Sequence, residues 1–261
     1  MSRLLMLYAL NRATAERKFE IKAEANEATV YLYDMIVGDD LTAEWWGGVS
    51  PNQFVRELNQ ITAPVIHLRI NCPGGDVFAA RVMELAIRQH PSKVVAHIDG
   101  YAASAASFLA VACDEVEIAK GGFFMIHKAW SMCWGNADEM LKMADLLDKI
   151  DESLVITYAD ATEQDAQQLR DWMTVETWFN AEESIEYGFA DRLAETETKA
   201  SAWNMSMYDK APKATTEKEP DPEIKPEPAL EPAAPDNSFL NQDHRVRQQQ
   251  RMSVLARTSI A

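Results

Sequence analysis

The stretch Pro64-Val-Ile-His-Leu-Arg-Ile-Asn-Cys-Pro-Gly-Gly-Asp76 indicates the fold class, because a short apolar strand runs into a glycine turn. Residues 77–89 then alternate apolar and polar residues at helical spacing, and 94–98 form a second apolar strand that ends at Asp99-Gly100. A helix is expected from Ser104 through Ala112, followed by strands at 115–118 and 123–126. Strands alternating with helices predict βαβ units and a mainly parallel sheet covered on its faces.

The regions on either side extend this pattern. Residues 17–36 form a strand pattern rich in β-branched and aromatic residues. Residues 51–61 are expected to be a helix with Phe54, Leu58 and Ile61 on one face. Beyond the strands, apolar spacing predicts a long amphipathic helix over 138–159 and shorter helices over 163–173 and 181–188.

Composition divides the chain into an N-terminal extension, a folded domain, an acidic Pro/Glu-rich linker and a basic C-terminal segment, at 1–16, 17–195, 196–236 and 237–261. Residues 213–236 contain almost no large apolar side chains. They cannot bury enough surface to offset the entropy lost on ordering, so a disordered tail is expected. The basic end is interpreted as a solvated tail or a docking segment, and its removal by self-cleavage is a further hypothesis.

The formal net charge of the 261 residues is −16, which argues against a general nucleic-acid binder because phosphate contact requires clustered Lys and Arg. The three cysteines are odd in number and lack C-x-x-C spacing, so neither a disulfide framework nor a metal site is expected, and no cofactor. No apolar run reaches the roughly 18 residues that span a membrane. Residues 1–15 have the order of a signal peptide, but their apolar run is short, so an intracellular extension and a cytoplasmic protein are expected.

Three turns that follow predicted strands carry candidate chemistry: Pro73-Gly-Gly75, Ser104 and His127. Parallel strands can bring such turns to one edge of the sheet. A serine hydroxyl needs a base to accept its proton, and His127 is the candidate. The glycine amides could hold an oxyanion. The alternatives are that Ser104 is the N-cap of an Ala-rich helix and that His127 is a hydrogen-bonded core residue.

A triad also needs an acid that orients the imidazole, and Glu176 is the first candidate. It precedes the last helix in a loop with Trp178 and Phe179. Asp171 is the second candidate. The alternative for both is a solvated surface carboxylate.

Four motifs occur in one order: Asn71-Cys-Pro-Gly-Gly-Asp76, Gly100-Tyr-Ala-Ala-Ser104, Met125-Ile-His127 and Ala181-Glu-Glu-Ser-Ile-Glu-Tyr-Gly-Phe-Ala-Asp191. They resemble the patterns N-S-P-G-G, G-x-A-A-S, M-I-H and S-A-x-E-A-x-E-Y-G-x-x-D of the ClpP-type serine peptidases. The resemblance covers about residues 17–195. It is closest to the ClpP-related head maturation proteases of tailed phages, because Glu176-Thr-Trp178 matches their E-T-W.

The resemblance implies an α/β, crotonase-like fold of repeated ββα units with a long protruding helix at 138–159, assembled into a cyclic homo-oligomer. It also implies roles for individual residues: Ser104 as nucleophile, His127 as general base, Glu176 as orienting acid, and the amides of Gly74 and Ala105 as oxyanion hole. Ser107, one helical turn after Ser104, is expected to face the helix packing and to be dispensable for chemistry.

Two positions depart from the family pattern. Cys72 replaces the usual Ser before Pro-Gly-Gly, which we expect to be tolerated because the backbone there does the chemistry. Glu176 replaces the usual Asp, and its extra methylene affects how it can orient the imidazole.

Three functions are compatible with these features. The first is a serine endopeptidase that cleaves capsid or scaffold proteins during phage head maturation through an acyl-enzyme, in the host cytoplasm or the procapsid. The second is a ClpP-like subunit served by a separate unfoldase ATPase, because the chain has no G-x-x-x-x-G-K-[ST] motif. The third is a non-catalytic assembly or scaffold protein. Acyl-CoA chemistry on this fold is disfavoured by the Ser, His and acid set. The expected partners are protein or peptide substrates, and neither nucleic acid nor membrane.

Overall fold

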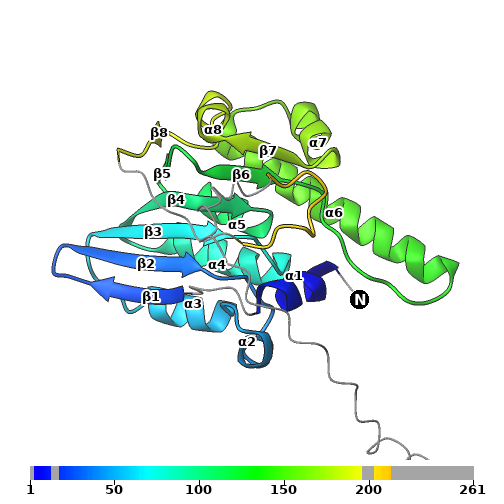
Figure 1. Cartoon of the computed structure of the whole chain (residues 1–261), viewed down its shortest axis with the longest axis horizontal. Coiled ribbons are helices and arrows are strands. Elements are labelled where there is room, and N and C mark those ends of the chain that lie inside the picture. The colour runs from blue at the N-terminus through cyan, green and yellow to red at the C-terminus, as the bar shows by residue number, and fades with distance from the viewer. Residues whose placement is uncertain (1–2, 13–17, 196–202, 213–261) are drawn as a thin grey trace, which may run out of the picture. The chain divides into compact units, whose positions relative to one another are not determined.

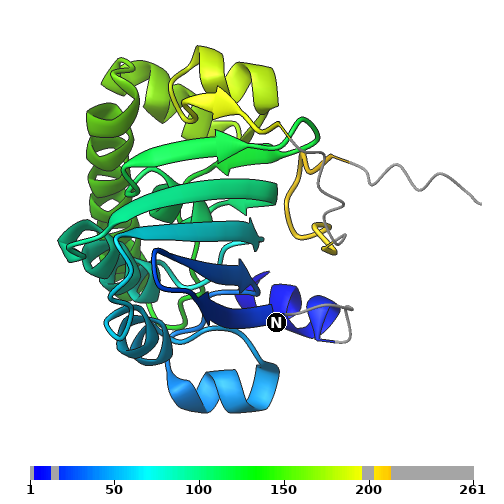
Figure 2. The same cartoon turned by 90° about the vertical axis from the view of Figure 1, so that its left-hand side faces the viewer.

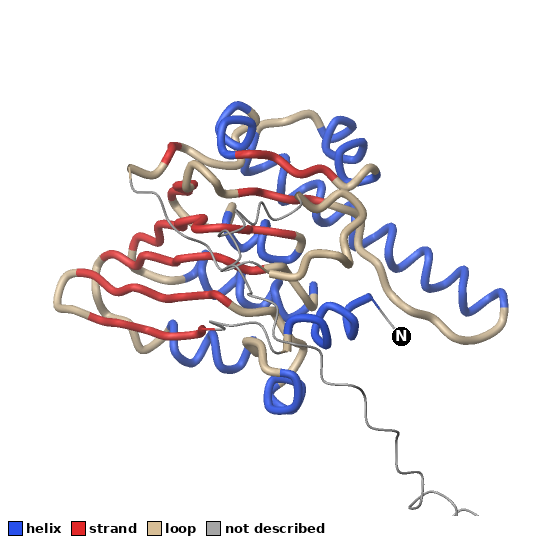
Figure 3. Tube along the Cα trace, viewed as in Figure 1, coloured by secondary structure: helices blue, strands red, loops and turns tan. Residues whose placement is uncertain are grey.

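A computed structural model describes residues 3–12, 18–195 and 203–212, and it confirms the expected α/β class. Eight strands form one sheet in the order β1-β2-β3-β4-β5-β8, while β6 pairs with β4 and β7 (Figure 1, Figure 3). The strands are β1 Lys18–Ala23, β2 Glu27–Tyr33, β3 Val65–Cys72, β4 Lys93–Ala103, β5 Glu115–Ile118, β6 Phe123–Ile126, β7 Thr177–Asn180 and β8 Arg192–Leu193.

The centre of the sheet is parallel. Strands β2 to β5 and β8 run in one direction, as does β6 beside β4, whereas β1 and β7 are antiparallel to their partners. The carboxyl ends of β3, β4 and β6 therefore lie at the same edge, and the three candidate turns begin there.

The helices are α1 Arg3–Asn11, α2 Asp40–Trp46, α3 Pro51–Leu58, α4 Val77–Gln89, α5 Ala105–Ala110, α6 Ala137–Thr162, α7 Ala166–Thr174 and α8 Ala181–Glu186. Helices α4 and α6 lie on one side of the sheet, which Figure 2 shows nearly edge-on. Alternate strand residues such as Ile66, Leu68 and Ile70 point to this side and are fully buried. None of the helices in the described part of the chain is both long and apolar enough to cross a membrane.

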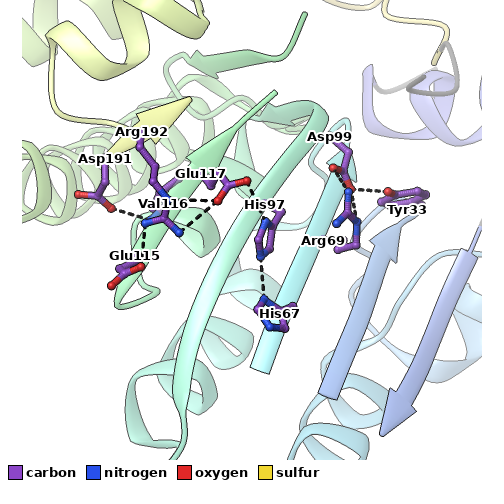
Figure 4. A network of polar contacts seen from close by, with 10 residues as sticks. All are labelled: Tyr33, His67, Arg69, His97, Asp99, Glu115, Val116, Glu117, Asp191 and Arg192. Carbon is purple, nitrogen blue, oxygen red and sulfur yellow. Dashed lines mark hydrogen bonds and ion pairs between the residues drawn. The ribbon is translucent and has the colours of Figure 1, made fainter. Parts of the chain in front are cut away.

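The opposite face of the sheet carries a network of polar side chains across β2 to β5 (Figure 4). On this face Arg69 forms an ion pair with Asp99, and Tyr33 donates to the same carboxylate. Beside them, His67 Nδ1 lies 2.9 Å from His97 Nε2. The cause is the alternation within β3, where polar His67 and Arg69 occupy the positions between the buried apolar residues.

The expected elements are found with shifted ends. The strand expected at 94–98 continues to Ala103, because its Asp99 is paired with Arg69 and therefore tolerated within β4. Past Ile98, β4 exchanges β5 for β6 as its partner. Strands β7 and β8 and helices α1 and α2 were not expected, and the strand pattern at 17–36 forms two strands, β1 and β2.

Residues 203–212 lie within the predicted linker but pack against the domain. Their side chains Trp203, Met205, Met207 and Tyr208 are buried, together with Leu7 of α1. The remainder of the expected linker from 213 and the basic segment at 237–261 lie outside the described residues.

Gly75→Ala is expected to lower the free energy of unfolding by at least about 2 kcal/mol, because a side chain there collides with buried backbone. Gly75 has φ +148°, and a Cβ would lie 1.9 Å from the carbonyl oxygen of Ile36. Gly121→Ala is the matched control, since its Cβ meets nothing within 4 Å and its expected effect is within about 0.5 kcal/mol. Urea unfolding of both variants measures the difference. Equal free energies of unfolding for the two variants would contradict the close approach of Gly75 to the Ile36 carbonyl.

Candidate active site

Ser104 occupies a strained turn between β4 and α5. Its backbone has φ 53° and ψ −122°, a region that non-glycine residues rarely adopt, and its side chain makes no capping hydrogen bond to α5. The amide of Ser104 donates to Met125 O on β6 at 2.9 Å. This turn leaves the hydroxyl free of the helix and holds it beside the end of β6.

His127 follows β6 directly and meets this hydroxyl. Its Nε2 lies 2.7 Å from Ser104 Oγ, within hydrogen-bond distance. Burial lowers the pKa of His127 to about 4, and the nearby Glu176 carboxylate opposes this effect only in part. The imidazole is therefore neutral near pH 7 and can accept a proton.

The Pro73-Gly74-Gly75 turn lies against the Ser104 turn. Gly74 has φ +95°, and a Cβ there would lie 2.8 Å from Ser104 Cβ and 3.1 Å from the amide nitrogen of Ala105. The Gly74 amide donates to Cys72 Sγ at 3.4 Å. Burial raises the pKa of the Cys72 thiol, so the sulfur stays protonated and is not a competing nucleophile.

Glu176 is buried and engaged with groups other than the histidine. Its carboxylate accepts from Trp178 Nε1 at 3.1 Å, from the Asp209 amide at 3.0 Å and from the Lys210 amide at 2.7 Å. Within the described residues, no hydrogen bond joins Glu176 to His127. The structure therefore brings the serine and the histidine together but bonds the candidate acid elsewhere.

Asp171, the second acid candidate, and Ser107 take no part in the contact between Ser104 and His127. Asp171 is exposed on α7, where it accepts from Gln167 Nε2 at 2.9 Å. Ser107 is fully buried and lies 2.6 Å from the hydroxyl of Tyr158, which agrees with a packing role. Among the described residues, no three His, Cys, Asp or Glu side chains cluster as metal ligands.

Tyr208 belongs to the site and was missed by the sequence reasoning. Its ring packs edge-on against His127 with the ring centroids 5.4 Å apart, and its hydroxyl donates to Pro73 O at 2.5 Å. The available signal was the run Trp203-Asn-Met-Ser-Met-Tyr208, which places four large apolar side chains within a polar region.

A cavity of about 270 Å³ opens beside the serine and the histidine. One wall is formed by α6 through Met143, Leu147 and Ile150, so the cavity is mainly apolar. It can hold an apolar side chain next to the reactive hydroxyl.

Comparisons with known proteins find similarity to one family. A family model described as Clp protease matches residues 50–197. ATP-dependent Clp protease proteolytic subunit 1 of Leifsonia xyli is 26% identical over 133 residues, covering 50% of this chain and 68% of the relative. Proteolytic subunit 2 of Pseudomonas aeruginosa is 27% identical over 149 residues, covering 54% and 71%. Proteolytic subunit 2 of Treponema denticola is 29% identical over 162 residues, covering 61% and 80%.

The His127 imidazole is expected to titrate near pH 4 rather than near its ordinary value of 6.5, because burial disfavours the charged ring. The ring should therefore stay neutral as the pH falls from 7 to about 5.5. A histidine NMR titration, with the His127 signals assigned by His127→Gln, measures this midpoint. A midpoint at the ordinary value would contradict the buried environment.

Proposed function

The chain belongs to the Clp protease family, whose model matches more than half of it, and we propose that it is a serine endopeptidase. Ser104 is the nucleophile and His127 the general base. The observation that carries this proposal is the 2.7 Å contact between Ser104 Oγ and His127 Nε2. A neutral, partly buried imidazole at this distance is suited to take the hydroxyl proton as the oxygen attacks.

The reaction proceeds through an acyl-enzyme. Ser104 Oγ attacks the scissile carbonyl and His127 takes the proton, then returns it to the leaving amine. Water, activated by His127, hydrolyses the ester. The oxyanion is assigned to the amides of Ala105 and Gly74. Ala105 begins α5 and its N–H has no partner within the helix, whereas the Gly74 N–H must exchange its weak bond to Cys72 Sγ for the oxyanion.

Glu176 is assigned as the acid that orients His127, on the basis of its buried carboxylate and its position in the family pattern. Its charge already acts on the imidazole through space, raising the pKa of His127 against the effect of burial. A direct bond to His127 Nδ1 requires the carboxylate to turn toward that ring from the orientation in which it accepts from the Asp209 and Lys210 amides.

The substrate class is a polypeptide with an apolar side chain at the cleavage site. Support comes from the cavity beside Ser104, where Met143, Leu147 and Ile150 of α6 offer apolar contact. Such a cavity favours apolar side chains of matching size and disfavours charged ones, because burying an unpaired charge is costly.

A separate unfoldase ATPase is the proposed partner for folded substrates. The similar proteins are described as ATP-dependent proteolytic subunits, whereas this chain has no nucleotide-binding G-x-x-x-x-G-K-[ST] motif. We also propose that this chain assembles into a cyclic homo-oligomer. The finer expectation of capsid or scaffold cleavage has no counterpart among these relatives and rests on the Glu176-Thr-Trp178 match alone.

Ser104→Ala is expected to abolish both labelling by a fluorophosphonate probe and peptide cleavage, because the attacking oxygen is removed. Ser131→Ala is the matched control, since this exposed serine lines the same cavity. Its labelling rate should stay within about twofold of wild type. Mass spectrometry of the labelled peptide identifies the site. A probe that still labels Ser104→Ala, or that labels no serine of the folded wild type, would overturn the assignment and favour a non-catalytic assembly role.

Degradation of a folded protein is expected to need an unfoldase and ATP, whereas a short apolar peptide is cleaved without them. The physical reason is that a cavity of about 270 Å³ can hold a side chain of an extended segment but not a folded domain. The assay compares both substrates with and without purified Clp-type unfoldase and ATP. Full-rate processing of a folded capsid or scaffold protein by the chain alone would contradict the ATPase partnership and support the head maturation function.

A further inference from the structure

Residues 203–212, called the strap here, contact the turns that carry the proposed chemistry. Trp203 Nε1 donates to Asn71 O at 2.9 Å, just before the Pro73-Gly74-Gly75 turn. Tyr208 Oη donates to Pro73 O within that turn at 2.5 Å. The strap is thus fixed to the edge of the sheet at which Ser104 lies.

The strap also covers His127. The Tyr208 ring packs edge-on against the imidazole, and Tyr208 lines the same cavity as Ser104 and His127. Only 4% of Tyr208 is exposed, as is 5% of Trp203. This cover contributes to the burial that keeps the pKa of His127 low.

The strap occupies the candidate acid as well. The Asp209 and Lys210 amides each donate to one oxygen of the Glu176 carboxylate, and they hold it in an orientation without a hydrogen bond to His127. One strap residue therefore covers the proposed base, and two others fix the orientation of its candidate acid.

The strap contains turns but no helix or strand, so its release breaks no sheet ladder. Its attachment consists of the hydrogen bonds above, its buried apolar side chains and polar contacts with α1. The Asn204 amide donates to Asn11 Oδ1 at 2.7 Å, and Asn11 Nδ2 donates to Asn204 O at 3.0 Å. An exposed Arg3–Asp209 ion pair at 3.6 Å adds little. Such a segment can open locally while the domain stays folded.

We propose that the strap is an intramolecular inhibitor that keeps the site latent until it is displaced. Displacement uncovers His127 and lets the Glu176 carboxylate turn to bond to His127 Nδ1. This inference rests on the proposed peptidase function, but the cover itself is measurable without catalysis.

The test weakens the strap at single positions of the full chain. Tyr208→Ala removes the ring over His127, and Lys210→Pro removes an amide donor to Glu176 without removing a buried side chain. Ser206→Ala is the matched control, because within the described ranges this exposed strap residue bonds to Asn204 alone. Thermal melting identifies the variants that keep the wild-type fold. If Tyr208→Ala does not fold, Lys210→Pro provides the test.

Two rates are measured at pH 7 for each variant. Diethyl pyrocarbonate acylates neutral imidazole, and mass spectrometry follows its reaction at His127 with His90 as internal reference. A fluorophosphonate probe reports the reactivity of Ser104. Both rates are expected to rise on the order of tenfold in Tyr208→Ala and Lys210→Pro, because the open state becomes the major population. Both should stay within about twofold of wild type in Ser206→Ala.

The outcomes separate the two proposals. An unchanged rate of acylation of His127 in folded strap variants would contradict the proposal that the strap covers His127. Faster acylation of His127 without any fluorophosphonate labelling would support the cover and contradict the role of Ser104. Faster acylation with slower labelling would show that the strap builds the site, and would overturn the inhibitory role.

Discussion

The strained turn at Ser104 is the constraint on which the site depends. A residue with φ 53° and ψ −122° is held there because its amide donates to β6 on one side while Gly74 packs against it on the other. Neither contact exists unless β3, β4 and β6 are parallel and end together. The eight-stranded sheet, the glycine turn and the buried core can be understood as the support that keeps one hydroxyl off the N-terminus of α5 and next to His127.

Burial then sets the chemistry of the pair. Removing His127 from water disfavours its charged form, so the ring is neutral but carries an unfavourable cost whenever it accepts a proton. An orienting carboxylate offsets that cost in a triad. In this structure Glu176 instead satisfies the backbone of residues 209 and 210, and Tyr208 adds to the burial. The same contacts that stabilise the closed arrangement therefore weaken the base.

Much of this arrangement follows from local sequence pattern. The strands at 115–118 and 123–126 and the helix at 77–89 are found as expected, because their apolar spacing reflects one buried face. Strand β7 has only four residues and depends on pairing with β6, so its own sequence carries little signal. The Glu176 carboxylate accepts hydrogen bonds from backbone amides of a segment distant in the sequence, and no sequence motif predicts such bonds. The packing of the strap could not be predicted from the sequence, because its apolar residues lie among polar neighbours.

The most direct measurement is a crystal structure of the full chain after reaction with a fluorophosphonate. We expect phosphorus bonded to Ser104 Oγ, with the phosphoryl oxygen within hydrogen-bond distance of the Gly74 and Ala105 amides. The strap should be displaced from His127, and Glu176 should be bonded to that ring. An adduct on another residue, or a Ser104 with ordinary helical N-cap geometry and its hydroxyl bonded to α5, would contradict the central role of this turn.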